Sequence, residues 1–505
     1  MNNSGKVFLV GAGPGDIGLL TLKGWDVLKH ADVVVYDNLV GDEVLAAIPK
    51  SACAVNVGKR MNHHNMPQEE INEILVREAK NGSRVVRLKG GDPFIFGRGG
   101  EEAEALAREK IPYEIVPGVT SAAAVPAYAG IPVTHRDFAS SLHIVTGHRR
   151  SGGEYDIDFK ALVRAGGTIV FLMGVTALGD LMKGLIEGGA DPDLPASVIQ
   201  KGTTAAQKSV TATVSTLEDE VKRQGITAPA VIVVGQVCGL AETLSWRGRL
   251  PLAGRKIVIT RPADRISETA KKLRRKGAEV LELPAISTQA IKNNEKLDLC
   301  IENLNKYNWI VFTSPAGVRI FFGKMLEHGK DARCLSGIKT AAIGRGSAGS
   351  LKKHGIIADL VPETYDGESL GNALAEKVQE NAKILIPRSA IGNKDIIKAL
   401  EVRPDVMIDD IAVYDTFYVN QDILDERRKF EAGEIDCAVF TSASTVKGFV
   451  NSVKSLDYTK ITAVCIGRQT KEQAEKYGMK AYAAKEAAMD SVVDKVVEIF
   501  GNRNY

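Results

Sequence analysis

The sequence predicts an α/β protein made of several lobes, each with a sheet between helices. Three observations support this: short apolar runs such as Val7–Val10 recur along the chain, Gly-rich loops follow many of them, and stretches of helical periodicity come next. In the first half these runs are continuously apolar rather than alternating. They therefore indicate strands covered on both faces and a largely parallel sheet.

Length and composition narrow the class of protein. The 505 residues correspond to about three or four domains. A hydrophobic fraction of 44% with 25% charged residues excludes a mainly disordered chain. The net charge of only +3 argues against a general nucleic-acid binder, whose affinity comes from excess cationic charge. Met1–Lys6 is polar and no apolar stretch approaches the roughly 20 residues that span a bilayer, so we expect a cytoplasmic protein without a membrane partner.

Cysteine and histidine usage does not indicate a metal site. The six cysteines show no zinc spacing, so we expect buried, reduced thiols. The pair His63–His64 has no second pair at ligand spacing and is expected in a solvated loop. The predicted metal content is none.

The first half alternates strands and helices around two lobes that we expect to meet tightly. A strand ends at the loop Gly11–Asp16, and a helix is expected from about Leu19 to His30. Further strands are predicted at 32–37, 84–88, 142–147, 168–174 and 231–235. Trp246–Gly254 combines Gly, Pro and charge without periodicity, which is typical of a joint.

The second half contains a quasi-repeat. Three short segments recur in the same order at nearly constant spacing: 256–261 with 383–388, 311–314 with 439–442, and 343–345 with 466–468. They predict two similar α/β lobes whose Thr-Ser loops face each other across a cleft.

The loop Gly11–Asp16 does not fit a phosphate-binding loop. The third glycine of the dinucleotide pattern would fall at Asp16, whose carboxylate repels a pyrophosphate, and Pro14 lacks an N–H donor. No P-loop motif is present either. A Gly-rich loop beside an acid suits a cationic ligand, and S-adenosylmethionine, with its sulfonium and no phosphate, meets these constraints.

The first half resembles uroporphyrinogen-III C-methyltransferase over about residues 5–245. The long run Arg87–Gly99 carries most of the resemblance. Other matching segments are 10–16, 35–37, 57–60, 117–121, 134–136 and 145–148. The second half, about 254–500, resembles uroporphyrinogen-III synthase through 250–262, the two Phe-Thr-Ser loops, the Ile-Gly turns and 413–416.

The resemblance implies the fold and the domain limits. We expect a tetrapyrrole-methylase-type pair of α/β/α lobes followed by a two-lobed synthase-like α/β unit. The expected limits are 5–117 and 118–245 for the methyltransferase lobes, 246–254 for the linker and 255–505 for the synthase. Within the synthase, lobe one covers about 255–288 plus 417–505, and lobe two about 289–416.

For the first half the resemblance implies methylation of uroporphyrinogen III at C2 and C7 by S-adenosylmethionine, giving precorrin-2. Asp37 would accept a proton and Lys59 would donate one. The implied cofactor contacts are Pro14, Gly90, Gly91, Asp92, Ile95, Thr120, Ser121, Met173 and Gly202. Because the substrate carries eight carboxylates, we expect cationic anchors at Arg60, Arg98, His135 and Arg136. Related methyltransferases are dimers, so a homodimer through this half is expected.

For the second half the resemblance implies cyclisation of hydroxymethylbilane with inversion of ring D and without a cofactor. Tyr414 matches the tyrosine favoured as the acid for loss of hydroxyl. The hydroxyl groups expected to bind substrate carboxylates belong to Thr313, Ser314, Thr441, Ser442 and Thr470. Only about five residues precede the first strand, so we expect the chain to stop at precorrin-2, without dehydrogenase or ferrochelatase activity.

Structural roles remain open for several of these residues. Asp37 and Asp92 could form turns, Met173 could fill a core, and Tyr414 could place its hydroxyl in water. Lys59 and Arg60 could be a solvated pair, and the Thr-Ser pairs could cap helices. An alternative function also remains open: methylation of another tetrapyrrole precursor, or of a protein side chain, with a non-catalytic two-lobed binding or regulatory module behind it.

Overall fold

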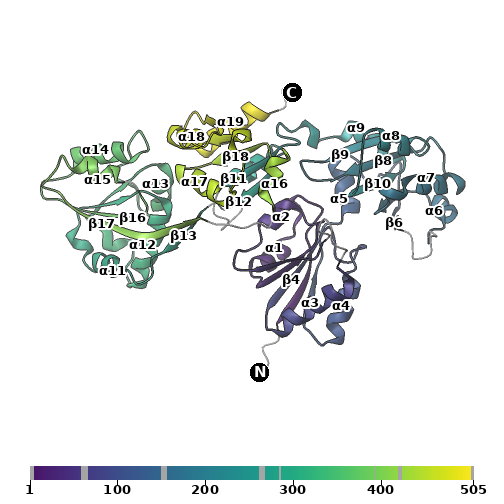
Figure 1. The fold of residues 1–505 in the computed structure, drawn as a ribbon, viewed down its shortest axis with the longest axis horizontal. Helices are drawn as coiled ribbons and strands as arrows, with labels where there is room; N and C mark the ends of the chain where they lie inside the picture. Colours follow the sequence, from purple (N-terminus) through teal and green to yellow (C-terminus); the bar gives the residue numbers. More distant parts are fainter. Residues whose placement is uncertain are drawn as a thin grey trace. The chain divides into compact units, whose positions relative to one another are not determined.

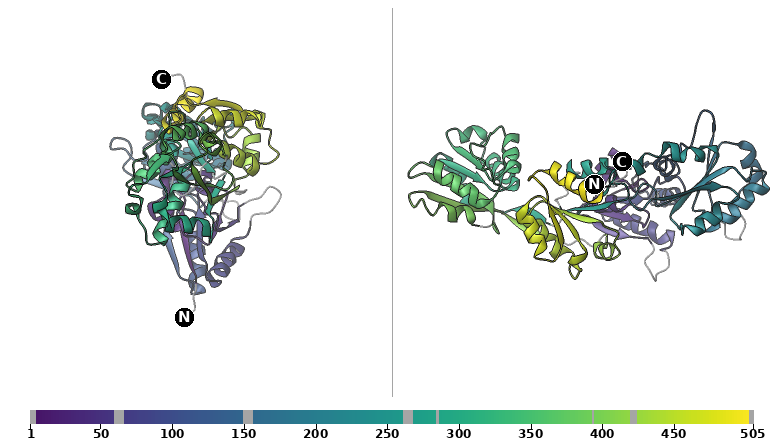
Figure 2. Two further views of the ribbon diagram at one scale, coloured as in Figure 1. Left: turned by 90° about the vertical axis from the view of Figure 1, so that its left-hand side faces the viewer. Right: turned by 90° about the horizontal axis from the view of Figure 1, so that it is seen from above.

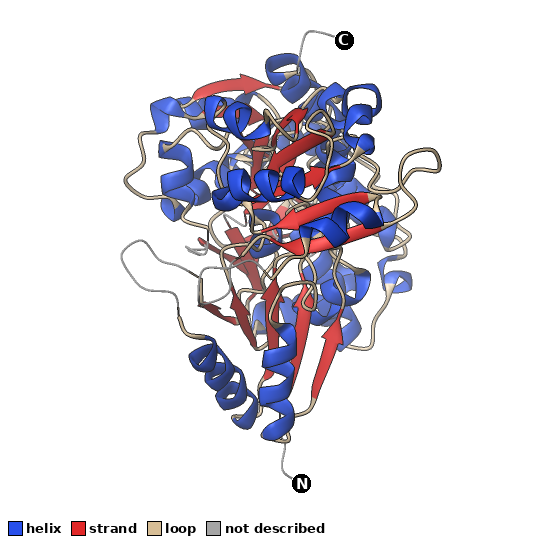
Figure 3. Cartoon of the chain, turned by 90° about the vertical axis from the view of Figure 1, so that its right-hand side faces the viewer, coloured by secondary structure: helices blue, strands red, loops and turns tan. Residues whose placement is uncertain are grey.

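In the part of the chain that the structure describes, strands and helices alternate, and the strands form four five-stranded sheets (Figures 1, 2 and 3). The computed structural model describes residues 5–58, 66–148, 156–260, 268–283, 286–392, 394–418 and 424–501. The chain divides into two compact units, and the second consists of Pro284–Asn420 with Gly448–Ser452. No helix in the described ranges is both long and apolar enough to cross a membrane.

The first sheet is fully parallel, as the continuous apolar runs predict, with the order β3-β2-β4-β1-β5. Its strands are β1 (Lys6–Gly11), β2 (Val33–Tyr36), β3 (Cys53–Asn56), β4 (Arg84–Lys89) and β5 (Tyr113–Val116). The helices between them are α1 (Leu22–Lys29), α2 (Asp42–Ala46), α3 (Gln68–Lys80) and α4 (Gly99–Arg108). Because all strands run the same way, the loops that follow them meet at one edge.

The first helix begins later than the sequence predicts. Asp16 caps a short 3₁₀ turn, Ile17–Leu19, by accepting a hydrogen bond from Gly18 N. Thr21 then caps α1 by accepting from Gly24 N. Two consecutive caps divide the expected helix into two pieces, because each cap side chain satisfies backbone donors at its own helix start.

The second sheet corrects the prediction of a largely parallel sheet. Its order is β6-β7-β10-β8-β9, and only β6 and β7 are parallel. The strands are β6 (Leu142–Thr146), β7 (Thr168–Leu172), β8 (Pro195–Gln200), β9 (Lys208–Thr213) and β10 (Ala230–Val234). The short connection between β8 and β9 permits only an antiparallel pair.

Burial on both faces of this sheet explains the continuous apolar runs. One apolar cluster packs against α7 (Leu178–Glu187) and α8 (Leu217–Arg223) and includes Phe171. Another, which includes Val170, packs against α5 (Ser121–Tyr128). A continuous run therefore reports that both faces are covered and says nothing about strand direction. Helix α6 (Phe159–Ala165) and the short α9 (Ala241–Leu244) complete this region.

The segment expected to be a joint is anchored to helix α5. Trp246 Nε1 donates to the carbonyl of Ala127 at 3.0 Å. The ring of Trp246 also packs edge-on against Tyr128, with ring centroids 5.2 Å apart.

The third sheet is fully parallel, with the order β12-β11-β18-β19-β20. Its strands are β11 (Lys256–Thr260), β12 (Glu279–Leu283), β18 (Cys437–Phe440), β19 (Thr462–Cys465) and β20 (Lys480–Ala483). Its helices are α10 (Glu268–Arg275), α16 (Glu426–Glu431), α17 (Ala443–Ser452), α18 (Arg468–Glu475) and α19 (Met489–Phe500).

The fourth sheet has the order β13-β17-β16-β14-β15, with β13 antiparallel at the edge. The strands are β13 (Ile286–Ala290), β14 (Trp309–Phe312), β15 (Lys339–Ala342), β16 (Lys383–Ser389) and β17 (Met407–Tyr418). The helices are α11 (Glu295–Glu302), α12 (Pro315–Glu327), α13 (Arg345–Lys353), α14 (Gly367–Lys377) and α15 (Asp395–Leu400).

The quasi-repeat falls on equivalent elements of these two sheets. The three matching pairs of strands are β11 with β16, β18 with β14, and β19 with β15. The matching strands are adjacent in the same order within their sheets, as β11-β18-β19 in the third sheet and β16-β14-β15 in the fourth. Their order along the chain differs, because β11 precedes its two partners whereas β16 follows them. The two lobes are therefore permuted versions of one arrangement.

All six cysteines are free thiols. Cys238, Cys300, Cys437 and Cys465 are buried, as expected, whereas Cys53 and Cys334 are exposed, so the expectation of buried thiols is wrong for these two.

Candidate functional site

The loops after β1, β4 and β5 are joined at the carboxyl edge of the first sheet. Gly13 and Gly91 exchange two backbone hydrogen bonds, with N···O distances of 3.2 and 2.8 Å. A Cβ at Gly118 would lie 2.3 Å from the carbonyl oxygen of Gly91. Only glycine allows this approach, which brings three loops together where a ligand can contact their backbones.

Asp92 holds this arrangement in place. Its Oδ1 accepts from the amides of Phe94 and Ile95 at 2.8 and 3.2 Å, and its Oδ2 accepts from Gly118 N at 3.0 Å. These three contacts fix the loop after β4 to the loop after β5, so the turn-forming role of Asp92 is present in the structure.

Asp16 links the Gly-rich loop to the second lobe. Its carboxylate accepts from Gly18 N at 2.7 Å and from the hydroxyl of Tyr128 at 2.9 Å, and its own amide donates to Thr203 Oγ1 at 3.2 Å. This proximity, together with burial, raises the pKa of the Tyr128 phenol above its usual range. The aspartate at the position of the third dinucleotide-motif glycine is thus a helix cap and a contact between lobes.

Strained backbone concentrates at these loops. Phe96, Arg98, Met173, Lys201 and Thr203 all have positive φ, between 45° and 69°, although none is glycine. Such residues cost of order 1–3 kcal/mol each and persist where a site requires them. Met173 is also 54% exposed, which is inconsistent with a role as core filler.

The predicted cofactor contacts lie on these loops. Pro14 follows β1, Gly90 and Gly91 follow β4, and Ile95 comes four residues later on the same loop. Thr120 caps α5, and Ser121 is its first residue. Met173 follows β7, and Gly202 follows β8, where a Cβ would lie 2.4 Å from Val125 Cγ1.

The residues present fit a methyl donor with an apolar adenosine and a cationic sulfur. Large apolar side chains are exposed at these loops, notably Leu39 at 61%, Ile95 at 39% and Met173 at 54%. Combined with close backbone approach and a nearby carboxylate, Asp37, they give the mixture of apolar walls and few polar groups typical of small-molecule sites.

Asp37 is held at the end of β2 by a buried ion cluster. Its Oδ1 accepts from Leu39 N at 3.0 Å, and its Oδ2 accepts from Arg87 Nη2 at 3.0 Å. The side chain of Asp37 is 25% exposed, whereas that of Arg87 is 4% exposed. The carboxylate therefore keeps an accessible part while a buried cation fixes its position.

The sequence interpretation missed three members of this cluster as site residues: Arg87, Lys89 and Glu102. Glu102 Oε1 accepts from Arg87 Nε at 3.0 Å and from Lys89 Nζ at 2.8 Å, and its side chain is fully buried. Burial and the neighbouring Arg87 lower the pKa of Lys89, and Glu102 opposes that change. The signal was present, since strand β4 carries three cations, and any of them that the sheet buries needs a buried partner.

The predicted substrate anchors of the first half are dispersed. Lys59 and Arg60 lie outside the described residues. Arg98 is exposed and paired with Glu101. Its Nε donates to both Glu101 carboxylate oxygens at 3.0 Å. The ring of His135 stacks on Phe138 with centroids 4.8 Å apart, and Arg136 beside it is exposed.

In lobe two of the second half, the structure brings Ser314 and Tyr414 together. Their hydroxyl oxygens are 2.8 Å apart, and Ser314 Oγ also caps α12 by accepting from Gly317 N at 3.0 Å. Tyr414 is only 6% exposed. Thr313 is half-buried at the end of β14. The hydroxyl of Tyr414 is thus oriented by a protein partner rather than left in water.

In lobe one, Thr441 and Ser442 occupy the corresponding loop after β18. Ser442 Oγ accepts from Thr445 N at 3.3 Å, which is a capping contact. Thr470, in the first turn of α18, is only 5% exposed. Its burial leaves little of the hydroxyl for a substrate carboxylate.

Both Thr-Ser loops lie at reversal points of their sheets. In the third sheet, β12 is added on one side of β11 and β18 on the other, so the order of strands reverses between β11 and β18. In the fourth sheet the same reversal lies between β14 and β16. Ligands of open α/β sheets bind outside the carboxyl ends of such neighbouring strands. Each loop therefore occupies a favourable position within its own lobe.

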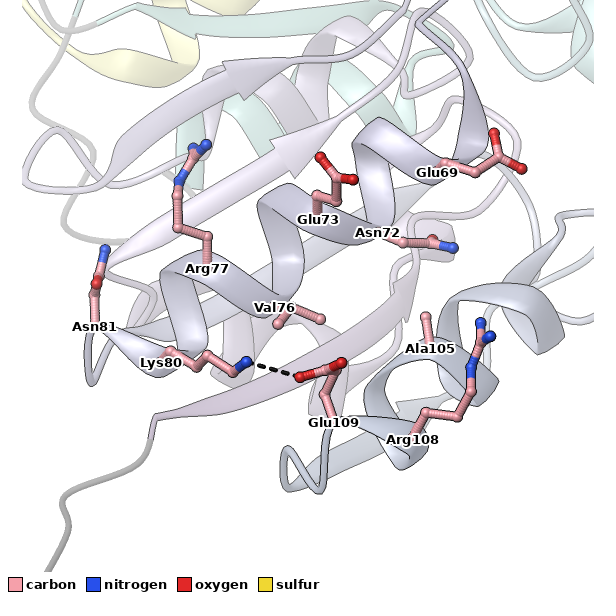
Figure 4. Close-up of a pocket in the computed structure, with 10 residues that line it drawn as sticks. All are labelled: Glu69, Asn72, Glu73, Val76, Arg77, Lys80, Asn81, Ala105, Arg108 and Glu109. Atoms are coloured by element: carbon pink, nitrogen blue, oxygen red, sulfur yellow. Dashed lines mark hydrogen bonds and ion pairs between the residues drawn. The ribbon is translucent and has the colours of Figure 1, made fainter.

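A groove on the lobe that contains the first sheet lies apart from the predicted site residues. It runs between α3 and α4 and is lined by Glu69, Asn72, Glu73, Val76, Arg77, Lys80, Asn81, Ala105, Arg108 and Glu109 (Figure 4). Lys80 and Glu109 pair across it at 2.7 Å. None of the predicted site residues lines this groove. Within the described part of the chain, no cluster of three or more His, Cys, Asp or Glu side chains could hold a metal ion.

Two family models match the chain. The model described as tetrapyrrole (corrin/porphyrin) methylases matches residues 6–218, and the model described as uroporphyrinogen-III synthase HemD matches residues 267–494.

Similar proteins span one or both halves. The chain is 46% identical over 501 residues to "Porphyrin biosynthesis protein HemD" of Ruminiclostridium josui, covering 99% of both proteins. It is 41% identical to the uroporphyrinogen-III C-methyltransferase of Bacillus subtilis, over 71% of this chain and 73% of that protein. A solved uroporphyrin-III C-methyltransferase of Thermus thermophilus, complexed with S-adenyl homocysteine, is 42% identical and covers 46% of this chain and 98% of its own, with a TM-score of 0.40.

The two models place the methylase match before the synthase match along the chain, and the relative of Ruminiclostridium josui spans both. The chain belongs to the family of fused porphyrin-biosynthesis enzymes in which a tetrapyrrole methylase of the uroporphyrinogen-III C-methyltransferase type precedes a uroporphyrinogen-III synthase.

Proposed function

We propose that the first half methylates uroporphyrinogen III at C2 and C7 to give precorrin-2, and that the second half makes uroporphyrinogen III by cyclising hydroxymethylbilane. Family membership supports both activities. The observation that carries the first is the meeting of three glycine-rich loops beside Asp37 at one edge of the first sheet. We propose the domain limits 5–117, 118–245 and 255–505, with 246–254 as linker.

S-adenosylmethionine supplies the methyl group and is proposed to bind at Pro14, Gly90, Gly91, Asp92, Ile95, Thr120, Ser121, Met173 and Gly202. Methylation of a pyrrole β-carbon leaves a cationic ring, which then loses a proton. Asp37 is the proposed acceptor, because Arg87 keeps its carboxylate in place and one side of it is accessible. Lys59 is the proposed proton donor. Arg60, Arg98, His135 and Arg136 are proposed to bind the substrate carboxylates.

In the second half, Tyr414 is proposed to assist loss of the hydroxyl group from hydroxymethylbilane. Ser314 orients the phenol through the 2.8 Å contact. Thr313, Ser314, Thr441, Ser442 and Thr470 are proposed to bind substrate carboxylates, with Thr470 the least accessible of them.

The experiment that tests both activities supplies the purified chain with hydroxymethylbilane, with and without S-adenosylmethionine. We expect type III uroporphyrinogen in the absence of the methyl donor and the dimethylated precorrin-2 chromophore in its presence. Type I uroporphyrinogen alone would refute the synthase activity. Type III product that stays unmethylated would refute the methyltransferase activity.

We also propose that the chain acts in the cytoplasm on small-molecule tetrapyrroles, without nucleic acid, as a homodimer through the methyltransferase half. Light scattering of the purified chain tests the dimer, and a monomeric mass at micromolar concentration would contradict it.

A further inference from the structure

A cluster of buried charges joins the methyltransferase half to lobe one of the synthase half. Helix α2 lies beside β12 (Figure 1). We define the interface cluster as six side chains, each at most 20% exposed: Asp42, Glu43, Lys256, Arg274, Glu279 and Lys429.

Asp42 anchors two separate elements of lobe one. Its Oδ2 accepts from Lys256 Nζ of β11 and from Lys429 Nζ of α16, each at 2.8 Å. Burial raises the pKa of Asp42, but Lys256 and Lys429 outweigh it and hold that pKa below its usual value. The buried carboxylate of Asp42 keeps its two cationic partners only while α2 stays packed against lobe one of the synthase half.

Glu43 connects the Gly-rich loop to strand β12. Its Oε1 accepts from Arg274 Nε at 2.7 Å and from the amide of Val280 at 3.0 Å. Its Oε2 accepts from the amide of Ile17 at 3.3 Å. Since Ile17 directly follows the loop Gly11–Asp16, one carboxylate joins that loop to the synthase strand.

Glu279 makes the reciprocal connection from the synthase side. Its Oε1 lies 2.9 Å from Lys256 Nζ, and its Oε2 accepts from the amide of Ala205 at 2.7 Å. Ala205 belongs to the β8–β9 connection, which also carries Gly202 and Thr203. The hydroxyl of Thr203 accepts in turn from Asp16 N.

We propose that lobe one of the synthase is a built-in partner of the methyltransferase, which holds both cofactor loops in position through Glu43 and Glu279. This inference rests on the proposed function, because it assigns those loops to S-adenosylmethionine. The physical reason is preorganisation: a loop amide bound to a buried carboxylate loses less freedom when the ligand arrives. Glu43 and Glu279 are positioning residues and do not touch the reacting atoms.

The test uses the full-length chain and measures S-adenosylhomocysteine binding by calorimetry together with amide hydrogen exchange. Glu279→Ala is the main variant, because it changes a residue of the synthase half. We expect its affinity to fall about tenfold, as for a lost hydrogen bond to a charged group, and peptides containing Ala205 to exchange faster. Glu43→Ala is expected to do the same for peptides containing Ile17.

A matched control and a conservative variant separate loop positioning from general destabilisation. Asp457→Ala removes a carboxylate that accepts from a backbone amide, Thr459 N, elsewhere in lobe one, so affinity should stay within twofold. Glu279→Gln keeps an oxygen for Ala205 N–H and should retain most of the affinity. Should Glu279→Ala not fold, Glu43→Ala is the decisive variant, because it removes the link between Ile17 N and strand β12.

Three outcomes would overturn the proposal, and they can be told apart. Unchanged affinity in folded Glu279→Ala and Glu43→Ala, with a parent chain that binds, would reject the positioning role alone. A parent chain that does not bind S-adenosylhomocysteine would reject the proposed function and this inference with it. An equal loss of affinity in Asp457→Ala would also reject the inference, because the effect would then not depend on the interface cluster.

Discussion

The carboxyl edges of the first and fourth sheets position their key side chains in different ways. At the first, Asp37 is held by Arg87, which is itself neutralised by the fully buried Glu102. At the fourth, the neutral hydroxyl of Tyr414 is held by the neutral hydroxyl of Ser314. One site is built on paired charges and the other on uncharged hydrogen bonds.

This difference matches the chemistry proposed for each site. A proton acceptor beside a cationic ring benefits from a fixed negative charge, and a buried cation behind it keeps that charge in place. A group that donates a proton to a departing hydroxyl, which then leaves as water, must still carry that proton when the substrate binds, and a neutral partner does not remove it. Substitutions at the two edges should therefore change turnover and stability in different ways.

The largest expected effect is that of Asp37→Asn on methylation. Turnover should fall about 10³-fold, because the amide cannot accept the proton, while S-adenosylhomocysteine affinity stays within about twofold. Formation of the precorrin-2 chromophore and calorimetry measure the two quantities. Asp32→Asn is the control, since Asp32 precedes β2 and accepts from Arg84 N at 2.7 Å. Small and equal losses in turnover and affinity would leave Asp37 with a structural role only.

Arg87→Met should destabilise the lobe that contains the first sheet by about 3–5 kcal/mol. The substitution leaves the buried Glu102 with Lys89 as its cationic partner and leaves Asp37 without Arg87. Thermal unfolding measures the loss. Arg77→Met, on the exposed face of α3 beside Glu78, should change the stability by less than about 0.5 kcal/mol. Similar melting curves for both variants would contradict a stabilising ion cluster behind Asp37.

Tyr414→Phe should lower synthase turnover about 100-fold and raise the share of spontaneous type I product, because the phenolic proton is lost. Chromatography of the uroporphyrinogen isomers measures both. Tyr307→Phe is a matched control: its hydroxyl donates to Asp409 at 2.5 Å, at the opposite end of the same sheet. If the two variants made the same isomer mixture at the same rate, Tyr414 would not be the acid.

The pH dependence of stability should show the titration of Glu43. Burial, together with the neighbouring carboxylates Asp16 and Glu279, raises its pKa from 4.5 to about 7 against the opposing effect of Arg274. The folded chain then binds this proton more tightly than the unfolded chain. The resulting stability is fully present below pH 4.5 and is lost as the pH rises through about 7.

Differential scanning calorimetry between pH 5 and 8 measures this contribution. The melting temperature of the parent chain should fall by a few degrees more than that of Glu43→Gln, which carries no titrating proton. Parallel curves for the two proteins would show that Glu43 does not titrate in this range.

The smallest expected effect is that of Ser314→Ala, which removes both the α12 cap and the partner of Tyr414. The cap accounts for about 1 kcal/mol of stability. Ser314→Thr keeps an oxygen and should recover most of it. Denaturant unfolding measures the free energy of unfolding of each variant. Equal stability of Ser314→Ala and the parent chain would show that the Ser314 cap does not stabilise α12.

Local patterns predicted much of the fold. Apolar runs located β1, β2, β4, β6, β7 and β10, and the quasi-repeat located equivalent elements in the third and fourth sheets. The same patterns did not show that β9 and β10 run opposite to β6, β7 and β8, and they missed the cap that divides the first helix. Apolarity measures burial, and strand direction depends on how the connections run.

The sequence by itself determined the α/β class, the glycines that let three loops approach, and the residue types available at each edge. Only the tertiary structure decided which of these side chains meet. Arg87 and Asp37 are 50 residues apart, and Glu43 and Val280 are 237 apart, yet each pair is hydrogen-bonded. Local propensity acts over a few residues, whereas the partner of a buried charge is selected by the packing of whole elements.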